Sequence, residues 1–189
     1  IGIERPQQEL SDLWCRLIAP RNIATLEAVK ESGGVDLLGD HHQDFPAEYL
    51  RWIGIGQHLS AVEFYKDQEI RTEIYDAIQS VLSKYDLLIT PTLACLPVEN
   101  SNDGNTVGPT EINGETVDPL IGWCLTYLLN FTGHPAASIP AGLSEDGLPV
   151  GMQIIGRRYA DADVLAASAA FERLRPWHES YRKCAERVL

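Results

Sequence analysis

The stretch from residue 128 to residue 156, LLNFTGHPAASIPAGLSEDGLPVGMQIIG, constrains the fold of this chain more than any other. Its first run is almost entirely apolar and stops at Gly133, which suits the left-handed position that ends a helix, while Pro135 prevents continuation. Two short apolar runs follow, separated by Ser-Glu-Asp-Gly at residues 144–147, which has the chemistry of a tight turn. The stretch therefore predicts a helix followed by two strands. It contains no pattern typical of a nucleophile, a metal site or a phosphate loop.

Helical patterns occupy most of the chain before residue 85. Residues 9–32 contain two helix-like segments, which Pro20 divides and a Gly-Gly pair ends. A further helix is predicted to begin at Ser60. Ser60 and Glu63 have the spacing of a capping box, in which each side chain satisfies a backbone N–H of the other residue. Apolar residues then recur every three or four positions, which is typical of a helix with one buried face.

The remaining elements complete an alternating pattern of helices and strands. Residues 87–90, LLIT, are a short apolar run typical of a buried strand. Residues 97–119 predict a long polar loop, and Asp118 then predicts the start of an apolar helix over residues 119–131. Asp161 is predicted to cap an alanine-rich helix. The order of these elements predicts an α/β fold with a mixed β-sheet flanked by helices.

The charge and hydropathy of the chain exclude some classes of partner. The formal net charge is −12, so the chain lacks the excess of Lys and Arg that binding to a nucleic-acid backbone requires. The apolar helix predicted over residues 119–131 is too short to cross a bilayer, which needs about 20 residues. Since we find no signal peptide, we expect a cytoplasmic protein without membrane contact. The absence of an initiator Met suggests a fragment or a processed product.

The sequence offers no convincing metal or redox motif. Cys15, Cys95, Cys124 and Cys184 lack the paired spacing of a zinc site and are expected to be free thiols. Residues 40–44, DHHQD, include potential metal ligands, but adjacent histidines point in different directions and no further ligand cluster lies nearby. A solvated loop is the stronger interpretation. We therefore expect neither a metal nor a cofactor.

Nucleophilic catalysis is not predicted for the residues of this chain. An activated serine needs a base and an oxyanion hole, and no G-x-S-x-G motif is present. Ser138 lies between apolar neighbours in a predicted strand and is expected to bond to backbone. The glycines at residues 54–56 and 151–156 lack the spacing of a dinucleotide-binding loop.

Several segments nevertheless occur together in an order that points to a family. They are KYDLLITPT (84–92), NFTGHPAASIPAG (130–142), GLPVGMQIIGRRYAD (147–161) and FERLRPW (171–177). This order resembles the C-terminal half of amidase signature enzymes, and residues 48–71 resemble the helical segment that precedes the first strand of that half. The resemblance covers about residues 40 to 180. It implies that residues 1–189 are the C-terminal segment of a single amidase domain, with residues 1–45 as a helical lead-in and residues 46–189 as a sheet-and-helix part.

The resemblance also implies where the chemistry lies. Family members hydrolyse amides with a Ser, cis-Ser, Lys triad, which a glycine- and serine-rich stretch in the N-terminal half supplies in part. This chain has no such stretch, because its Gly33-Gly34 pair is followed by Val35. We therefore expect no catalytic residue in this chain, which alone should be inactive, and we expect the N-terminal half as its partner, covalent or separate. Without that cover, the open sheet edge and apolar face favour association into a homo-oligomer.

The resemblance places the apolar helix before NFTGHP beside the acyl pocket. Relatives that act on glutamine carry an acidic residue one or two turns before the matching Asn, whereas no acid lies between Asp118 and Asn130. Trp123 stands at about that place. We therefore expect Trp123, Tyr127 and Asn130 to contact a small neutral or aromatic amide. The competing interpretation is that Trp123 and Tyr127, four residues apart, pack in the core and that Asn130 bonds at the helix end.

Three functions remain open from the sequence. The first is the C-terminal part of an amidase that hydrolyses a non-peptide carboxamide to an acid plus ammonia or an amine. The second is a non-catalytic binding or scaffolding subunit derived from an amidase. The third is a protein similar to the amidase-related subunit of an amidotransferase, which the missing acid in the pocket helix disfavours.

Overall fold

The computed structural model describes residues 3–102, 106–178, 180 and 182. The chain divides into two compact units. The helical unit contains Glu4–Glu73 and Val98–Trp123, and the sheet unit contains Ile1–Ile3, Ile74–Pro97 and Cys124–Leu189. No helix in the described ranges is both long enough and apolar enough to cross a membrane.

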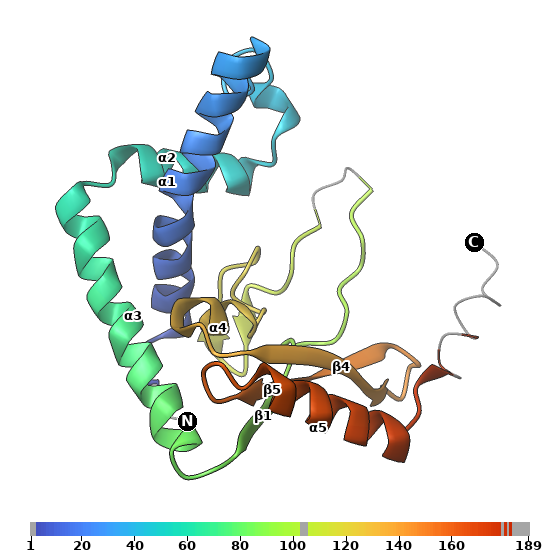
Figure 1. Cartoon of the computed structure of the whole chain (residues 1–189). Coiled ribbons are helices and arrows are strands. Elements are labelled where there is room, and N and C mark those ends of the chain that lie inside the picture. The colour runs from blue at the N-terminus through green and yellow to red at the C-terminus, as the bar shows by residue number, and fades with distance from the viewer. Residues whose placement is uncertain (1–2, 103–105, 179, 181, 183–189) are drawn as a thin grey trace. The chain divides into compact units, whose positions relative to one another are not determined.

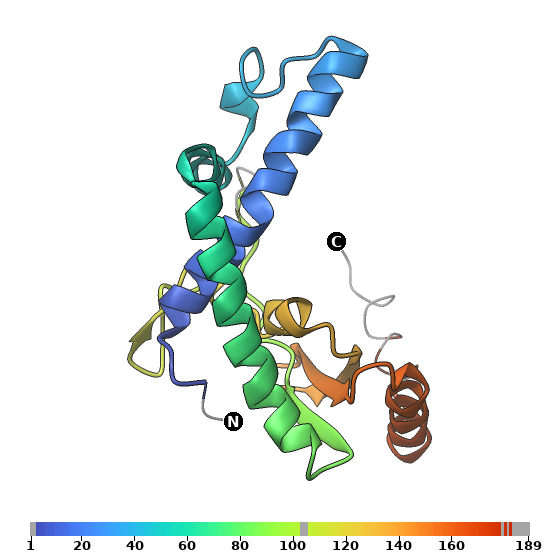
Figure 2. The same ribbon diagram turned by 60° about the vertical axis from the view of Figure 1, so that its left-hand side comes forward.

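The helical unit is built on the contact between α1 (Gln7–Gly33) and α2 (Ala47–His58), which Figures 1 and 2 show. The short helix η1 (His42–Asp44) lies between them in the sequence. The prediction that Pro20 divides residues 9–32 into two helices is wrong, because α1 is continuous. Next to Pro20, Ala19 is buried, and a Cβ atom added to Gly56 would lie 2.5 Å from the Ala19 Cβ. Close packing against α2 thus offsets the backbone hydrogen bond that Pro20 removes.

Helix α3 (Ala61–Leu82) begins with the predicted capping box. The Ser60 N–H donates to Glu63 Oε2 at 2.9 Å, and the Glu63 N–H donates to Ser60 Oγ at 3.2 Å. These bonds confirm the prediction and, together with the Ser60 hydroxyl, hold the pKa of Glu63 below its usual value. The first part of α3 belongs to the helical unit, and its last part, with the buried residues Ile74 and Ile78, belongs to the sheet unit.

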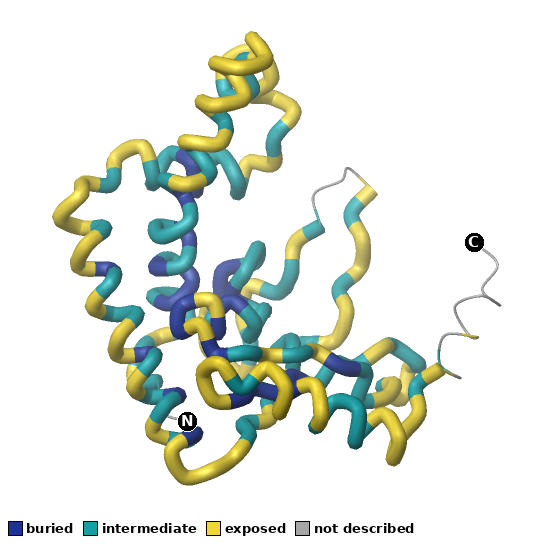
Figure 3. The backbone as a smooth tube through the Cα atoms, in the orientation of Figure 1, coloured by how far each residue is buried: buried dark blue, intermediate teal, exposed yellow. Residues whose placement is uncertain are grey.

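Three strands form the sheet in the order β1 (Leu87–Pro91), β5 (Pro149–Gly156) and β4 (Ala136–Leu143). The predicted strands and the α/β class with a helix-flanked sheet are confirmed. Both strand pairs are antiparallel, so the parallel pairing that a mixed sheet also requires is not seen among the described residues. One face packs against α5 (Asp161–Leu174), and Figure 3 shows buried positions within these strands.

The helix predicted over residues 119–131 is shorter than expected. The structure has only α4 (Tyr127–Thr132). Asp118 does cap backbone, since its Oδ1 accepts the N–H of Leu120 at 2.9 Å and of Ile121 at 3.3 Å, but the result is a turn and not a helix. Cys124 then pairs with Leu93 in an isolated β-bridge. The extended backbone that this bridge requires delays the helix until residue 127.

The ends of the C-terminal elements follow their local sequence in two of three cases. Gly133 ends α4 with a φ of 67°, and Gly147 has a φ of 78° in the turn between β4 and β5, as predicted. The prediction that Asp161 caps α5 is wrong, because Asp161 is the first helical residue and Ala160 holds the cap position without a side-chain bond. The loop at residues 97–119 contains a short hairpin, β2 (Glu111–Ile112) and β3 (Glu115–Thr116).

Candidate functional site

One face of the sheet carries a row of neutral polar side chains. The strand register pairs Gln153 with Thr90 on one side and with Ser138 on the other, so the three residues lie side by side across β1, β5 and β4. Successive side chains of a strand point to opposite faces. Ile139 and Ile154, which neighbour this row in sequence, pack against α5 with Val164. The polar row therefore lies on the face away from α5.

Two hydrogen bonds organise the polar row. Gln153 Nε2 donates to Thr90 Oγ1 at 3.1 Å, and the hydroxyl groups of Thr92 and Ser138 lie 2.7 Å apart. Ser138 thus bonds to a side chain and not to the backbone partner that its sequence context predicts. A Cβ atom added to Gly151 would lie 2.7 Å from Thr92 Oγ1. A glycine at residue 151 is therefore what allows the two hydroxyl groups to meet.

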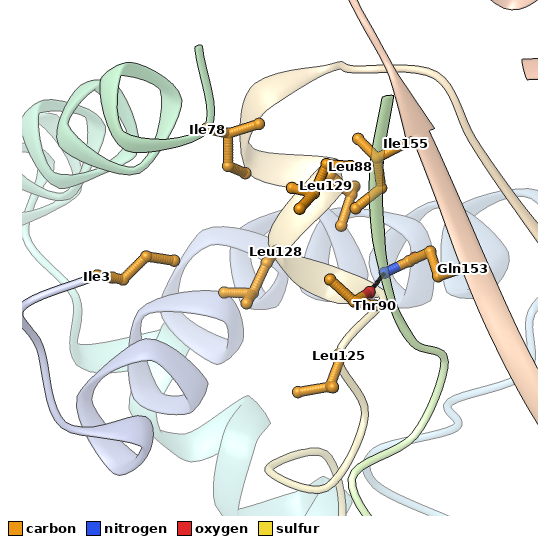
Figure 4. A pocket seen from close by; sticks show the side chains of 9 residues that line it. All are labelled: Ile3, Ile78, Leu88, Thr90, Leu125, Leu128, Leu129, Gln153 and Ile155. Carbon is orange, nitrogen blue, oxygen red and sulfur yellow. Dashed lines mark hydrogen bonds between the residues drawn. The ribbon is translucent and has the colours of Figure 1, made fainter. Parts of the chain in front are cut away.

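A pocket of about 170 Å³ lies over the first half of the row, and Figure 4 shows the side chains around it. We call it the α4 pocket because α4 and the residue segment before it form one wall. Its lining is apolar except for Thr90 and Gln153. The lining residues are Ile3, Ile78, Leu88, Thr90, Leu125, Leu128, Leu129, Gln153 and Ile155.

A second pocket, of about 230 Å³, lies at the Thr92–Ser138 hydroxyl pair. We call it the Cys95 pocket. It is lined by Thr92, Leu93, Cys95, Leu96, Pro97, Ser138, Pro149, Val150 and Gly151. None of the residues that line either pocket is charged. Both pockets therefore suit neutral groups that offer one or two hydrogen bonds.

The three predicted substrate-contacting residues do not lie on one helix. Trp123 belongs to the helical unit, where its Nε1 donates to the Pro119 carbonyl at 3.0 Å. Tyr127 and Asn130 belong to α4 in the sheet unit. Tyr127 is 2% exposed and its ring meets Phe131 edge to face, whereas Asn130 is exposed. The expectation that Trp123 and Tyr127 share a helix face is therefore wrong.

The sequence interpretation did not single out the polar groups of the α4 pocket. Thr90 and Gln153 each stand as a polar residue within an otherwise apolar strand, and this interruption is the signal that could have found them. The apolar wall was located more closely, since Leu128 and Leu129 lie in the segment that was expected to border the pocket.

The other candidate groups do not assemble into a centre in the described residues. His41 Nδ1 lies 3.0 Å from Asp44 Oδ2 in the exposed DHHQD segment. No three His, Cys, Asp or Glu side chains in the described ranges are placed to hold a metal ion. Cys15, Cys95 and Cys124 are free thiols, and burial raises the pKa of each. Cys184 lies outside the described residues.

His134 is a buried titratable group beside α4. Its Nδ1 lies 2.9 Å from Thr132 Oγ1, its Nε2 lies 3.3 Å from Gln79 Oε1, and its ring stacks on Tyr75. Burial, with a smaller contribution from the Arg158 charge, lowers the pKa of His134 below its ordinary value. The unfolded chain therefore binds a proton at a higher pH than the folded chain does.

This difference predicts a loss of stability in mild acid. As the pH falls below about 6.5, the ordinary histidine value, the unfolded chain gains its proton first and the free energy of unfolding decreases. The variant His134→Gln should show a smaller drop in melting temperature between neutral pH and about pH 5.5. The control is His42→Gln, which changes an exposed histidine. Equal pH dependence in both variants would contradict the prediction.

Comparison with known proteins gives consistent matches. The sequence model of the amidase family matches residues 22–165. The acylamidase of Rhodococcus erythropolis is 34% identical over 124 residues, which are 64% of this chain and 25% of the relative. The matching subunit of the glutamyl-tRNA(Gln) amidotransferase of Thermodesulfovibrio yellowstonii is 32% identical over 177 residues, which are 85% of this chain and 34% of the relative.

A solved structure extends the match to the whole chain. The crystal structure of a bacterial aryl acylamidase of the amidase signature family superposes with a TM-score of 0.93 at 51% identity, and it covers 100% of this chain and 38% of that protein. The chain thus spans between a quarter and two fifths of the length of these relatives. Because the family model matches more than half of the chain, this protein belongs to the amidase signature family.

Proposed function

We propose that this chain is the C-terminal part of an amidase that hydrolyses the C–N bond of a non-peptide carboxamide and releases an acid plus ammonia or an amine. The observation that carries the proposal is the match to the bacterial aryl acylamidase, which extends over the whole chain at 51% identity. The chain forms part of the substrate pocket, as one segment of a single cytoplasmic amidase domain with residues 1–45 as lead-in and residues 46–189 as sheet-and-helix part.

The catalytic triad lies outside this chain in our proposal. In the intact enzyme a serine Oγ attacks the amide carbon, and the Lys–cis-Ser relay transfers the serine proton to the leaving amine. Water then hydrolyses the acyl-enzyme to the acid and restores the serine. The N-terminal half that carries these groups is the partner of this chain. Where it is missing, the open sheet edge favours a homo-oligomer.

The substrate is a small neutral amide with an apolar or aromatic group. The supporting observation is that both pockets lack charged lining residues. We propose substrate contacts for Trp123, Tyr127 and Asn130. Exposed Asn130 is suited to direct contact, whereas buried Tyr127 acts by fixing α4, whose residues Leu128 and Leu129 line the α4 pocket.

An amidotransferase is the second candidate, because the amidotransferase relative from Thermodesulfovibrio yellowstonii matches 85% of this chain. That function requires recognition of the charged groups of glutamine. The uncharged lining of both pockets favours the amidase instead. A non-catalytic scaffolding protein is the third candidate.

The test combines mass with activity. The native protein that contains this chain is purified, its polypeptides are identified by denaturing intact-mass spectrometry, and para-nitroacetanilide and glutamine are offered as substrates. We expect anilide hydrolysis by a sample that carries a glycine- and serine-rich segment, and none by the 20.9 kDa chain alone. Turnover by the chain alone would contradict the placement of the triad. Ammonia release from glutamine only would identify an amidotransferase, and no turnover at all would favour the scaffold.

A further inference from the structure

We propose that Gln153 recognises the N–H group of a carboxamide substrate in the α4 pocket, with Oε1 as the hydrogen-bond acceptor. Gln153 would then be a specificity-determining residue that makes the enzyme prefer amides to the matching esters. This inference rests on the proposed amidase function and names the group by which the pocket distinguishes its substrate class.

The first argument is the state of the Gln153 side chain. The residue lies on the central strand β5 and is 3% exposed. Its Nε2 is engaged by Thr90, whereas its Oε1 has no hydrogen-bond partner among the described residues. In those residues the one fully enclosed side-chain N or O atom without a partner is Trp52 Nε1. Gln153 Oε1 is therefore accessible, and the α4 pocket is the space that Gln153 lines.

The second argument is that Thr90 fixes the orientation of the glutamine amide. The 3.1 Å bond between Nε2 and Thr90 Oγ1 joins neighbouring strands at directly paired positions. Because the amide group is planar, holding its nitrogen also holds its oxygen. The acceptor is thus positioned before any ligand arrives, and a ligand that uses it loses little additional side-chain entropy.

The third argument concerns the surroundings of this acceptor. Leu125, Leu128 and Ile155 line the same pocket, and Figure 4 shows them around Gln153 and Thr90. A hydrogen bond is stronger in such apolar surroundings than in water, and an unpaired polar group is correspondingly costly there. A ligand that fills the pocket must therefore offer a donor to Gln153 Oε1 or leave the oxygen desolvated and unpaired.

Amides and esters differ in the atom that would meet this oxygen. A primary or secondary carboxamide has an N–H donor beside its carbonyl group, whereas the matching ester has an oxygen that cannot donate. An ester thus places an acceptor against an acceptor, and sites built to bond a substrate N–H discriminate strongly against analogues that lack it. The neutral glutamine also avoids the cost of burying a carboxylate in an apolar pocket.

The test compares an amide and an ester in the complete enzyme. The values of kcat/KM are measured for para-nitroacetanilide and para-nitrophenyl acetate, and their ratio is compared between variants. Gln153→Leu removes the acceptor and should lower the amide-to-ester ratio about tenfold. Gln153→Glu keeps an acceptor oxygen and should retain more of the ratio. The matched control is Gln79→Leu, which removes an amide outside the lining of the α4 pocket and should leave the ratio unchanged.

A second variant covers a failure of Gln153→Leu to fold. Thr90→Val keeps the glutamine but releases its amide group, and the ratio should fall about threefold. Equal losses of amide and ester turnover in Gln153→Leu, or an unchanged ratio in both variants, would overturn the inference while the amidase function stands. The pocket would then be filled by protein and not by substrate. A parent enzyme without anilide turnover would overturn the proposed function itself.

Discussion

Replacing Asp118 with alanine is expected to destabilise the protein by about 3 kcal/mol. Asp118 is 2% exposed, and its Oδ2 accepts a hydrogen bond from Arg51 Nη2 at 2.6 Å. Its other oxygen accepts the backbone N–H groups of Leu120 and Ile121. Alanine would leave these N–H groups without their side-chain acceptor and Arg51 without its counter-ion. The measurement is the shift in the midpoint of denaturant unfolding of the protein that carries this chain.

The control for Asp118 is an ion pair at the surface. Asp86 is bonded to Arg157 at 3.0 Å, but the Asp86 side chain is 94% exposed. Exposed pairs contribute between about 0 and 1 kcal/mol, because water screens the charges and the side chains lose entropy. Asp86→Ala should therefore have little effect. Equal destabilisation by both substitutions would show that burial of Asp118 does not determine its contribution.

Features that depend on a few neighbouring residues could be predicted from the sequence. The capping box needs only Ser60 and Glu63, whose groups are three residues apart and meet as soon as the helix forms. Gly133 ends α4 for a similar reason, since a left-handed residue is a local requirement. The strands β1, β4 and β5 were also recognisable, because each is an apolar run with turn residues at its ends.

Features that depend on distant contacts were predicted less well. Pro20 should interrupt a helix, yet the contact of α1 with α2 keeps the helix continuous. The apolar run after Asp118 has the pattern of one helix, but the β-bridge between Cys124 and Leu93 imposes extended backbone within it. Neither contact can be inferred from the residues beside Pro20 or Cys124.

The candidate site shows the same division. Leu128 and Leu129 were within the expected pocket segment, because that segment is a continuous piece of sequence. Thr90 and Gln153 are 63 residues apart and meet only through the register of β1 and β5. A shift of one residue in that register would turn one of the two side chains to the opposite face. Such a pair becomes visible only when the strand partners are known.

Replacing Tyr127 with alanine is expected to have the largest effect on stability, a loss of about 3 to 5 kcal/mol. The side chain is 2% exposed and its ring contacts Phe131 at a centroid distance of 5.9 Å. Alanine would remove this buried aromatic volume and leave a cavity beneath α4. The same change should raise KM for an anilide, because Leu128 and Leu129 line the α4 pocket from the helix that Tyr127 anchors.

The comparison with Asn130→Ala separates the two roles proposed for α4. Asn130 is exposed, so its substitution should change the free energy of unfolding by no more than about 0.5 kcal/mol. If Asn130 contacts substrate, KM rises while the unfolding midpoint stays the same. If Tyr127 acts through packing, KM and the midpoint change together in Tyr127→Ala, and Tyr127→Leu restores part of both. A raised KM with an unchanged midpoint in Tyr127→Ala would instead place its side chain in direct contact with substrate.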